Sequence, residues 1–267
     1  MRSLEPRWSR FTLKMDFLIS AFNTILYQPL FNALVFLYQY LPGHDFGIAV
    51  IVLTIIIRLL LYPLMIKSIR SQKILSELQP KIQEIQQKYK NDKEKQTKEM
   101  MALYQKEKIN PFGGCLPLLV QLPILIALYR VFWKGLQPGA MNMLYSFVPN
   151  PGAIDPTFLG IINLGQGNVA LAIVAGITQF IQSKMLMPKN KKKEQGRGQM
   201  GHFSEMMQKQ MLYFFPIFTV LILLRLPSAI AVYWIVTALF SIGQQYLVLK
   251  PKMEGDEDKS SSSPSLP

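Results

Sequence analysis

The stretch FGIAVIVLTIIIRLLLYPLMI, residues 46–66, contains a single charged side chain, Arg58, in an otherwise apolar run. A helix that crosses a hydrocarbon layer of about 30 Å needs roughly 20 mostly apolar residues, because each residue rises about 1.5 Å. This stretch meets that requirement, and Arg58 lies close to its middle. It therefore predicts a membrane-spanning helix with a cation deep inside the bilayer.

Four further apolar stretches meet or nearly meet the same requirement: residues 113–133, 168–187, 212–226 and 229–249. Only Pro227 and Ser228 separate the last two, so we expect them to form a tight hairpin. Residues 46–249 are thus predicted to form the core of an all-α integral membrane protein with five transmembrane helices.

The composition supports this fold class and excludes several kinds of site. Charged residues make up only 17% of the chain, whereas soluble domains carry about 25%. The single cysteine, Cys115, excludes an internal disulfide, and His44 and His202 lie too far apart in sequence to indicate a zinc or haem site. No nucleophile–base pair is evident either, so we expect no enzyme, cofactor or metal.

The basic residues predict the orientation. Segment 67–110 holds eleven Lys and Arg residues and segment 184–210 holds seven, whereas segment 134–167 between them holds only Lys134. Short loops rich in Lys and Arg stay in the cytoplasm. Both basic segments and the C-terminus are therefore expected inside, with an acidic, Ser-rich and disordered tail at residues 250–267.

Residues 1–45 are expected to form an N-terminal tail and one helix. Residues 17–41 carry no charge, and their polar side chains fall on one half of a helical wheel, as is typical of an amphipathic helix lying in the outer interface. We favour that interpretation. Basic residues precede the helix and favour the cytoplasm, which fits a sixth span with the N-terminus inside. A third alternative is that Met15 is the true start.

Segment 67–110 is predicted to form a helical hairpin. Apolar residues alternate at spacings of three and four, as in the seam of a coiled coil: Leu75, Leu78, Ile82, Ile85 and Tyr89. A second apolar face follows the turn at Lys90–Asp92: Thr97, Met100, Met101, Leu103 and Tyr104. Pro80 is expected to kink the first helix. The hairpin is either a solvated spacer or a docking surface for a cytoplasmic partner or substrate.

Arg58 is the strongest candidate for a functional residue. An Arg at the bilayer centre costs about 2.5–3.5 kcal/mol, which the apolar residues of the same stretch offset. None of the five stretches contains Asp or Glu, so Arg58 has no acidic partner within them. This pattern predicts a cation in a water-filled cavity that receives an anionic partner, the alternative being an Arg that snorkels to one interface. Uncharged polar residues that could share the cavity include Gln121, Thr178, Gln179, Gln182, Thr219, Thr237, Ser241, Gln244 and Gln245.

Three motifs resemble the YidC/Oxa/Alb family of membrane protein insertases over roughly residues 46–249. They are IIIRLLLYPL around Arg58, the run LQPKIQEIQQKYK followed by MMALYQKEKINPFGGCLPLLVQLPILIALY, and YWIVTALFSIGQQ from Tyr233. The family fold is five membrane helices with a cytoplasmic helical hairpin after the first. One departure is Thr237-Ala238, which stands where the family often has an Asn pair.

The resemblance implies insertion and folding of membrane proteins without nucleotide hydrolysis. In the family an Arg of the first span lies in a hydrophilic groove that is open to the cytoplasm and to lipid. Arg58 matches that Arg, and Gln121, Gln182 and Trp234 are expected to line the same client-binding groove. The implied partners are nascent membrane proteins and membrane lipids in the plasma membrane. The Sec translocon and the ribosome are further candidates, whereas DNA is not expected.

Two rival functions remain for the same residues. In a small anion-selective channel or transporter, Arg58 would select the anion. In a membrane scaffold, Arg58 would pair with one stoichiometric partner and the 67–110 hairpin would bind it.

Overall fold

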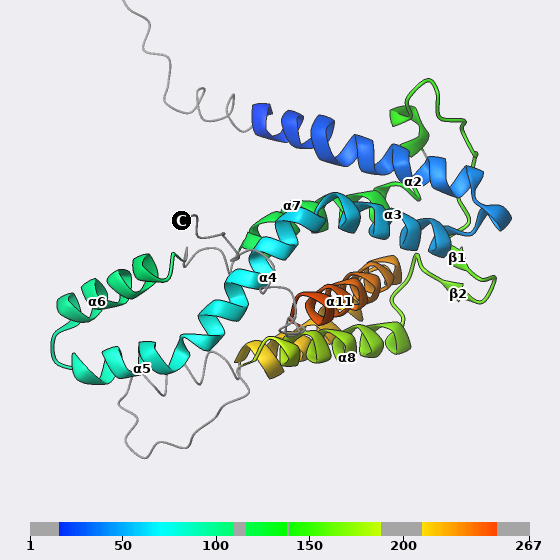
Figure 1. The fold of residues 1–267 in the computed structure, drawn as a ribbon. Helices are drawn as coiled ribbons and strands as arrows, with labels where there is room; N and C mark the ends of the chain where they lie inside the picture. Colours follow the sequence, from blue (N-terminus) through cyan, green and yellow to red (C-terminus); the bar gives the residue numbers. More distant parts are fainter. Residues whose placement is uncertain (1–15, 109–115, 138, 188–209, 250–267) are drawn as a thin grey trace, which may run out of the picture.

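The computed structural model describes residues 16–108, 116–137, 139–187 and 210–249. Helices dominate this part of the chain (Figure 1). The longer ones are α2 (Gln28–Tyr40), α3 (Phe46–Leu60), α4 (Tyr62–Glu77), α5 (Gln79–Lys88), α6 (Lys93–Lys106), α7 (Leu116–Lys134), α8 (Val169–Met185), α10 (Phe215–Leu223) and α11 (Ser228–Leu249). The predicted tail at residues 250–267, residues 113–115 of the second predicted span and most of the basic segment 184–210 lie outside the described residues.

The first predicted span is not one straight helix. It divides at Leu61 into α3 and α4, which are bent by 67° relative to each other. Pro63 stands in the first turn of α4 and has no backbone N–H to donate to the carbonyl of Leu59, four residues earlier. The straight helix that carries Arg58 therefore ends at Leu60, rather than at Ile66 as the sequence predicted.

The lengths and compositions of the described helices do not confirm the predicted count of five spans. By length and composition, the helix Asp16–Tyr40 and residues Ser228–Val248 of α11 can each cross a membrane, and α3 with α4 would make a third span if the bent pair is one. The helices α8 and Leu212–Leu223 are apolar but shorter. The structure thus fits a helical membrane protein, while the count of five spans stays a prediction.

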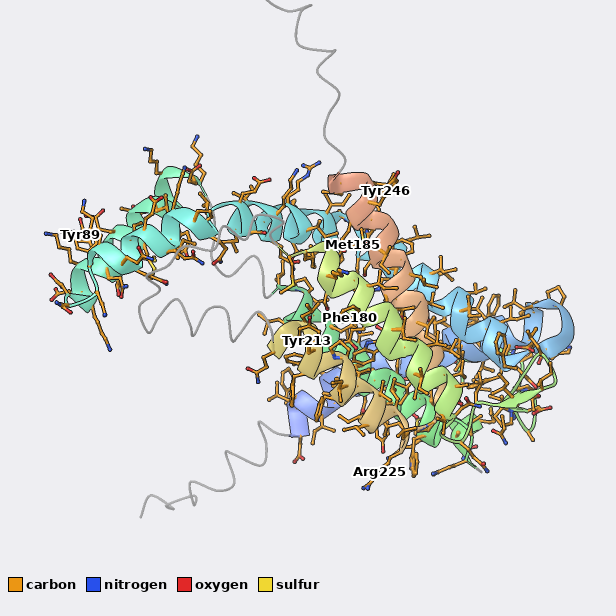
Figure 2. All side chains as sticks on the ribbon, turned by 90° about the horizontal axis from the view of Figure 1, so that it is seen from below. Tyr89, Phe180, Met185, Tyr213, Arg225 and Tyr246 are labelled. Atoms are coloured by element: carbon orange, nitrogen blue, oxygen red, sulfur yellow. The ribbon has the colours of Figure 1, made fainter. Side chains whose placement is uncertain are left out.

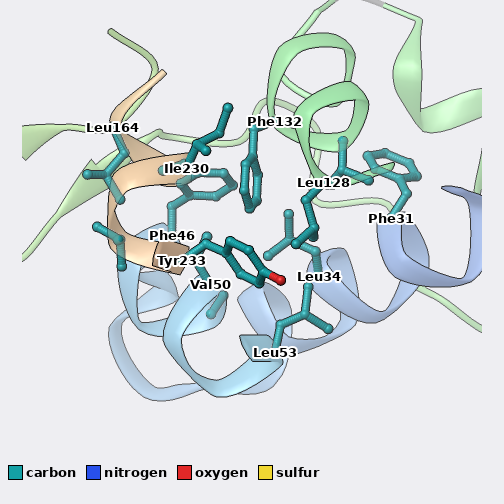
Figure 3. Close-up of a cluster of buried hydrophobic side chains, with 14 of the residues drawn as sticks. Phe31, Leu34, Phe46, Val50, Leu53, Leu128, Phe132, Leu164, Ile230 and Tyr233 are labelled. Carbon is teal, nitrogen blue, oxygen red and sulfur yellow. The ribbon is translucent and has the colours of Figure 1, made fainter. Parts of the chain in front are cut away.

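The core lies where α11 packs against α3 and α8 (Figure 1). Phe46 of α3 meets Phe132 of α7 with ring centroids 6.1 Å apart and nearly perpendicular planes. Figure 3 shows these rings gathered with apolar side chains of α2, α3, α7 and α11. The labelled members on the helices are Phe31, Leu34, Phe46, Val50, Leu53, Leu128, Phe132, Ile230 and Tyr233. Burial of these side chains fixes the position of α3, and hence of Arg58.

The segment between α7 and α8 contains the short strands β1 (Thr157–Phe158) and β2 (Ile162–Asn163), which the all-α prediction did not include. They pair antiparallel, with Thr157 opposite Asn163. Asp45 links this hairpin to α3, because its carboxylate accepts from the backbone N–H of Ile48 at 2.8 Å and from that of Leu159 at 2.5 Å. Asp45, the N-cap residue of α3, thus also anchors the β1–β2 hairpin.

The N-terminal helix buries one polar side chain, Asn32, in the protein, whereas Asp16, Ser20 and Thr24 are exposed. It runs from Asp16 to Tyr40 and includes a π-helical turn, η1 (Asn23–Tyr27), before α2. Asn32 is only 3% exposed, and its side chain donates to the carbonyl of Met143 at 3.1 Å and accepts from the N–H of Tyr145 at 2.6 Å. Ile25 and other large apolar side chains face outward instead. The helix therefore presents an apolar surface to its surroundings.

The N-terminal helix contacts α3 and α7 and lies beside α3 in Figure 1. The length and composition of the helix permit a span, and the choice between the interfacial and the spanning alternative stays a prediction.

The helices α5 and α6 pack side by side and project away from the core (Figure 1). As the sequence predicted, the preceding helix breaks at Leu78, and Pro80 lies in the first turn of α5. Two details differ, because Thr97 and Met101 are exposed while Gln96 is buried and donates to the carbonyl of Gln86 at 3.2 Å. Burial also raises the pKa of the Tyr104 hydroxyl. The hairpin therefore has a small interior that is partly polar.

We expect Asn32→Leu to lower the thermal stability of the purified protein in detergent. The substitution leaves the N–H of Tyr145 without its side-chain partner, which costs about 1–3 kcal/mol for a buried group. The carbonyl of Met143 loses one of its two amide donors and keeps Gln28. Gln39→Leu is the matched control on the same helix, where no comparable hydrogen bond is lost. Equal melting temperatures for the two variants would contradict the role of Asn32.

The interfacial and spanning alternatives for the N-terminal helix differ in where Asp16 lies. An interfacial helix keeps Asp16 on the outer side, whereas a span places it in the cytoplasm. In an Asp16→Cys variant that also carries Cys115→Ser, we expect a membrane-impermeant thiol reagent to label intact cells. Labelling only after the cells are opened would favour the span.

Candidate functional site

Arg58 lies in the last turn of α3, buried between α7 and α11. Its Nη2 donates to Oε1 of Gln121 on α7 at 3.1 Å, and its Nε donates to Oγ1 of Thr237 on α11 at 3.4 Å. The side chain is only 5% exposed. The sequence predicted a hydrated cation in a cavity, whereas here neutral side chains enclose the guanidinium.

Gln121 connects Arg58 of α3 to Tyr233 of α11. Its Nε2 donates to the hydroxyl of Tyr233 on α11 at 2.5 Å. Pro123 lies two residues beyond Gln121 in the same helix, where it interrupts the regular backbone hydrogen bonding of α7. Arg58, Gln121 and Tyr233 thus form one polar chain through an otherwise apolar core.

No carboxylate pairs with Arg58 among the residues that the structure describes. The two ion pairs in that part of the chain are Lys73 with Glu77 and Lys81 with Glu107, both outside the core. A buried charge without a counter-ion is destabilising, because neutral hydrogen bonds replace only part of its hydration. Arg58 therefore keeps an uncompensated attraction for an anion.

The structure joins some of the expected site residues and leaves others apart. Gln121 and Thr237 contact Arg58 directly, which gives Thr237 a role despite its departure from the family pattern. Gln182 of α8 and Trp234 of α11 are half-buried, and no described hydrogen bond connects either to Arg58. Their place in the site remains a prediction.

Tyr233 is the member of the site that residue type alone did not indicate. It lies within the motif YWIVTALFSIGQQ, and one helical turn separates it from Thr237. Residues four apart on a helix share a face, so this spacing could have placed Tyr233 beside Thr237. The nearby Thr54, by contrast, donates to the carbonyl of Val50 in its own helix at 2.6 Å.

A buried polar stripe extends along α11 from Thr237 toward the C-terminal end of the helix. Ser241, Gln244 and Gln245 follow Thr237 at spacings that keep them on one face, and all three are buried. Gln244 is 3% exposed, yet neither its Oε1 nor its Nε2 has a hydrogen-bond partner in the described residues. The Oε1 atom of Gln245 is likewise buried without a hydrogen-bond partner in the described residues.

Unpartnered buried amides are costly, at about 1–3 kcal/mol for each group. Such groups in native proteins normally bind water or a ligand. The unpartnered amide atoms of Gln244 and Gln245 therefore offer donors and acceptors for water or a ligand.

The described residues contain no cluster of three or more His, Cys, Asp or Glu side chains that could hold a metal ion. Together, the apolar helices and the buried polar cluster around Arg58 fit a helical membrane protein with polar groups in its core.

The comparisons with known proteins assign the family. Residues 36–256 match the family described as 60Kd inner membrane protein, so the chain belongs to that family. This confirms the resemblance seen in the sequence, and the match places the chain among inner membrane proteins.

Several relatives carry the name Membrane protein insertase YidC. One from Fusobacterium nucleatum subsp. nucleatum is 36% identical over 77% of this chain and 87% of its own length. One from Clostridium tetani is 37% identical over 82% of this chain and 88% of its own. A longer relative from Magnetococcus marinus is 37% identical over 79% of this chain, which spans only 33% of that protein.

We expect Gln121→Leu to destabilise the protein more than Thr237→Val. The first substitution removes the acceptor of the Arg58 Nη2 group at 3.1 Å and the donor to Tyr233, whereas the second removes one longer contact of 3.4 Å. Loss of a hydrogen bond to a charged group costs about 1.5–3 kcal/mol. Thermal unfolding in detergent measures the difference, and a larger loss for Thr237→Val would contradict this geometry.

Proposed function

We propose that this chain inserts client transmembrane segments into the membrane and assists their folding, with Arg58 as the electrostatic contact. The observation that carries the proposal is a buried guanidinium whose described partners, Gln121 and Thr237, are both neutral. Membership of the 60Kd inner membrane protein family supports it.

A client carboxylate supplies the charge that Arg58 lacks. At 4 Å, and with an effective dielectric constant of about 20, opposite unit charges attract by about 4 kcal/mol. A guanidinium has five N–H donors, and the two described hydrogen bonds use only two of them. A carboxylate can therefore bind in a bidentate manner while Gln121 or Thr237 shifts aside.

The polar stripe on α11 is the proposed route to Arg58. Ser241, Gln244 and Gln245 connect the Arg58 site to the C-terminal end of α11, which the positive-inside pattern places in the cytoplasm. The unpartnered amide groups of Gln244 offer hydrogen bonds to water or to the client backbone. They lower the barrier for a polar client tail that leaves the cytoplasm.

Burial of the apolar client helix in lipid supplies the driving force, because transfer of apolar surface from water is favourable. Nucleotide hydrolysis is not required for such a step. On the same basis we propose the predicted groove with Gln182 and Trp234, the cytoplasmic C-terminus and a docking role for the α5–α6 hairpin. We also retain the Sec translocon and the ribosome as proposed partners.

Substitution of Arg58 tests the mechanism in proteoliposomes. We expect Arg58→Ala to reduce insertion of a client with an acidic N-terminal tail by at least about tenfold, a change equivalent to 1.4 kcal/mol. A client with a neutral tail should lose much less. Arg58→Lys is the charge-preserving control and should retain part of the activity. Equal insertion of both clients by Arg58→Ala and the parent would overturn the mechanism.

Gln121→Glu provides a second, independent arm. It places a carboxylate at the atom that already accepts from Arg58, so the site carries its own counter-ion. We expect this variant to fold but to insert acidic clients poorly. Full activity of Gln121→Glu would show that Arg58 does not act by charge. Ion-flux measurements on the same liposomes separate insertion from the rival anion channel, which alone predicts sustained selective conductance.

A further inference from the structure

A second cation, Arg130 of α7, lies outside the Arg58 site and is enclosed by the N-terminal helix. Its guanidinium carbon lies 5.0 Å from the ring centroid of Tyr27 and 5.7 Å from that of Phe22. Its Nη1 donates to Oδ1 of Asn23 at 2.8 Å. Arg130 is thus held in place by two aromatic faces and one amide.

This cation has no counter-ion in the described part of the chain, where the two ion pairs lie elsewhere. Arg130 takes no part in the proposed insertion mechanism, and its place near the end of α7 is typical of an Arg that snorkels to the interface. One hydrogen bond to Asn23 uses one of its five N–H donors. The guanidinium is therefore fixed in position but not neutralised.

The hydroxyl of Tyr27 is an independent sign of a missing ligand. Tyr27 is only 2% exposed, and its hydroxyl oxygen is buried without a hydrogen-bond partner in the described residues. Because the ring of Tyr27 contacts Arg130, an unpaired hydroxyl and an unpaired cation belong to the same cluster. A phosphate oxygen satisfies both, since it accepts from a hydroxyl and from a guanidinium.

The surroundings identify the ligand as a lipid. Trp133, half exposed, stacks on Tyr129, with centroids 6.0 Å apart, in the last turns of α7. Exposed aromatic residues near a helix end are typical of the membrane–water interface, where lipid phosphates lie. Lys134 follows Arg130 by one helical turn and is exposed, which adds a second positive charge on the same face.

We propose that Arg130 and Tyr27 bind the phosphate of an anionic phospholipid at the junction of α7 and the N-terminal helix. Lys134 increases the preference for a lipid with a net negative charge. The site goes beyond the proposed insertase activity, because its ligand is a resident lipid rather than a client. A bound lipid would also strengthen the contact between the two helices that form the site.

The test uses the full-length protein in detergent, with phosphatidylglycerol as the probe and phosphatidylcholine as the neutral comparison. Bound lipid is counted by native mass spectrometry, and stability is followed by thermal unfolding. We expect phosphatidylglycerol to be retained and to raise the melting temperature more than phosphatidylcholine does. Arg130→Gln should bind phosphatidylglycerol about tenfold more weakly or worse, since a charge-assisted contact is lost.

Arg225→Gln is the matched control. Arg225 follows α10, is exposed, and extends from the edge of the molecule in Figure 2. This variant should bind phosphatidylglycerol as the parent does. Equal binding by Arg130→Gln and Arg225→Gln would overturn the proposal. So would equal protection of the parent by inorganic phosphate at the same concentration, because the ligand would then not be a lipid.

Tyr27→Phe separates ligand binding from a purely structural role of the cluster. The substitution removes only the unpartnered hydroxyl and keeps the ring that contacts Arg130. Without lipid we expect unchanged or higher stability, because a buried unsatisfied group is removed. With phosphatidylglycerol we expect severalfold weaker binding. Unchanged lipid binding by this variant would contradict the assignment of Tyr27 as a ligand.

Discussion

The structure depends on how a positive charge is kept inside an apolar helix bundle. Arg58 is buried and held by Gln121 and Thr237, which are polar but uncharged. Neutral ligands make burial of the guanidinium tolerable without satisfying its charge. No carboxylate of the described residues pairs with Arg58. A counter-ion at this place would stabilise the site and, in the proposed mechanism, weaken its attraction for a client.

The rest of the bundle positions this charge. α11 contributes Tyr233 and Thr237 to the site, and the buried stripe of Ser241, Gln244 and Gln245 continues along the same helix. The apolar contacts of α3 with α11 and α7 fix the position of Arg58 along the helix bundle. Polar groups are therefore aligned along one helix face, and their unpartnered amides make the path suitable for water or polypeptide.

The loops at the other end of α3 are held by backbone hydrogen bonds to two side chains. Asp45 links the start of α3 to the β1–β2 hairpin by hydrogen bonds. Asn32 links α2 in the same way to Met143 and Tyr145, which precede that hairpin. Each side chain accepts from backbone N–H groups of a segment that has little regular structure of its own. This end of the bundle is thus closed by specific contacts, whereas the polar stripe leads in the opposite direction.

The amino-acid sequence determined the helical membrane class and the family, and it marked Arg58 as the candidate functional residue, because long apolar runs and an isolated charge are local properties of the chain. The break at Pro80 could be read in the same way. The bend at Leu61, the burial of Arg58 and its contacts with Thr237 and Tyr233 arise from packing between segments far apart in sequence. Periodicity shows which residues share a helix face, but not which face meets which neighbour, and only the assembled bundle supplies that information.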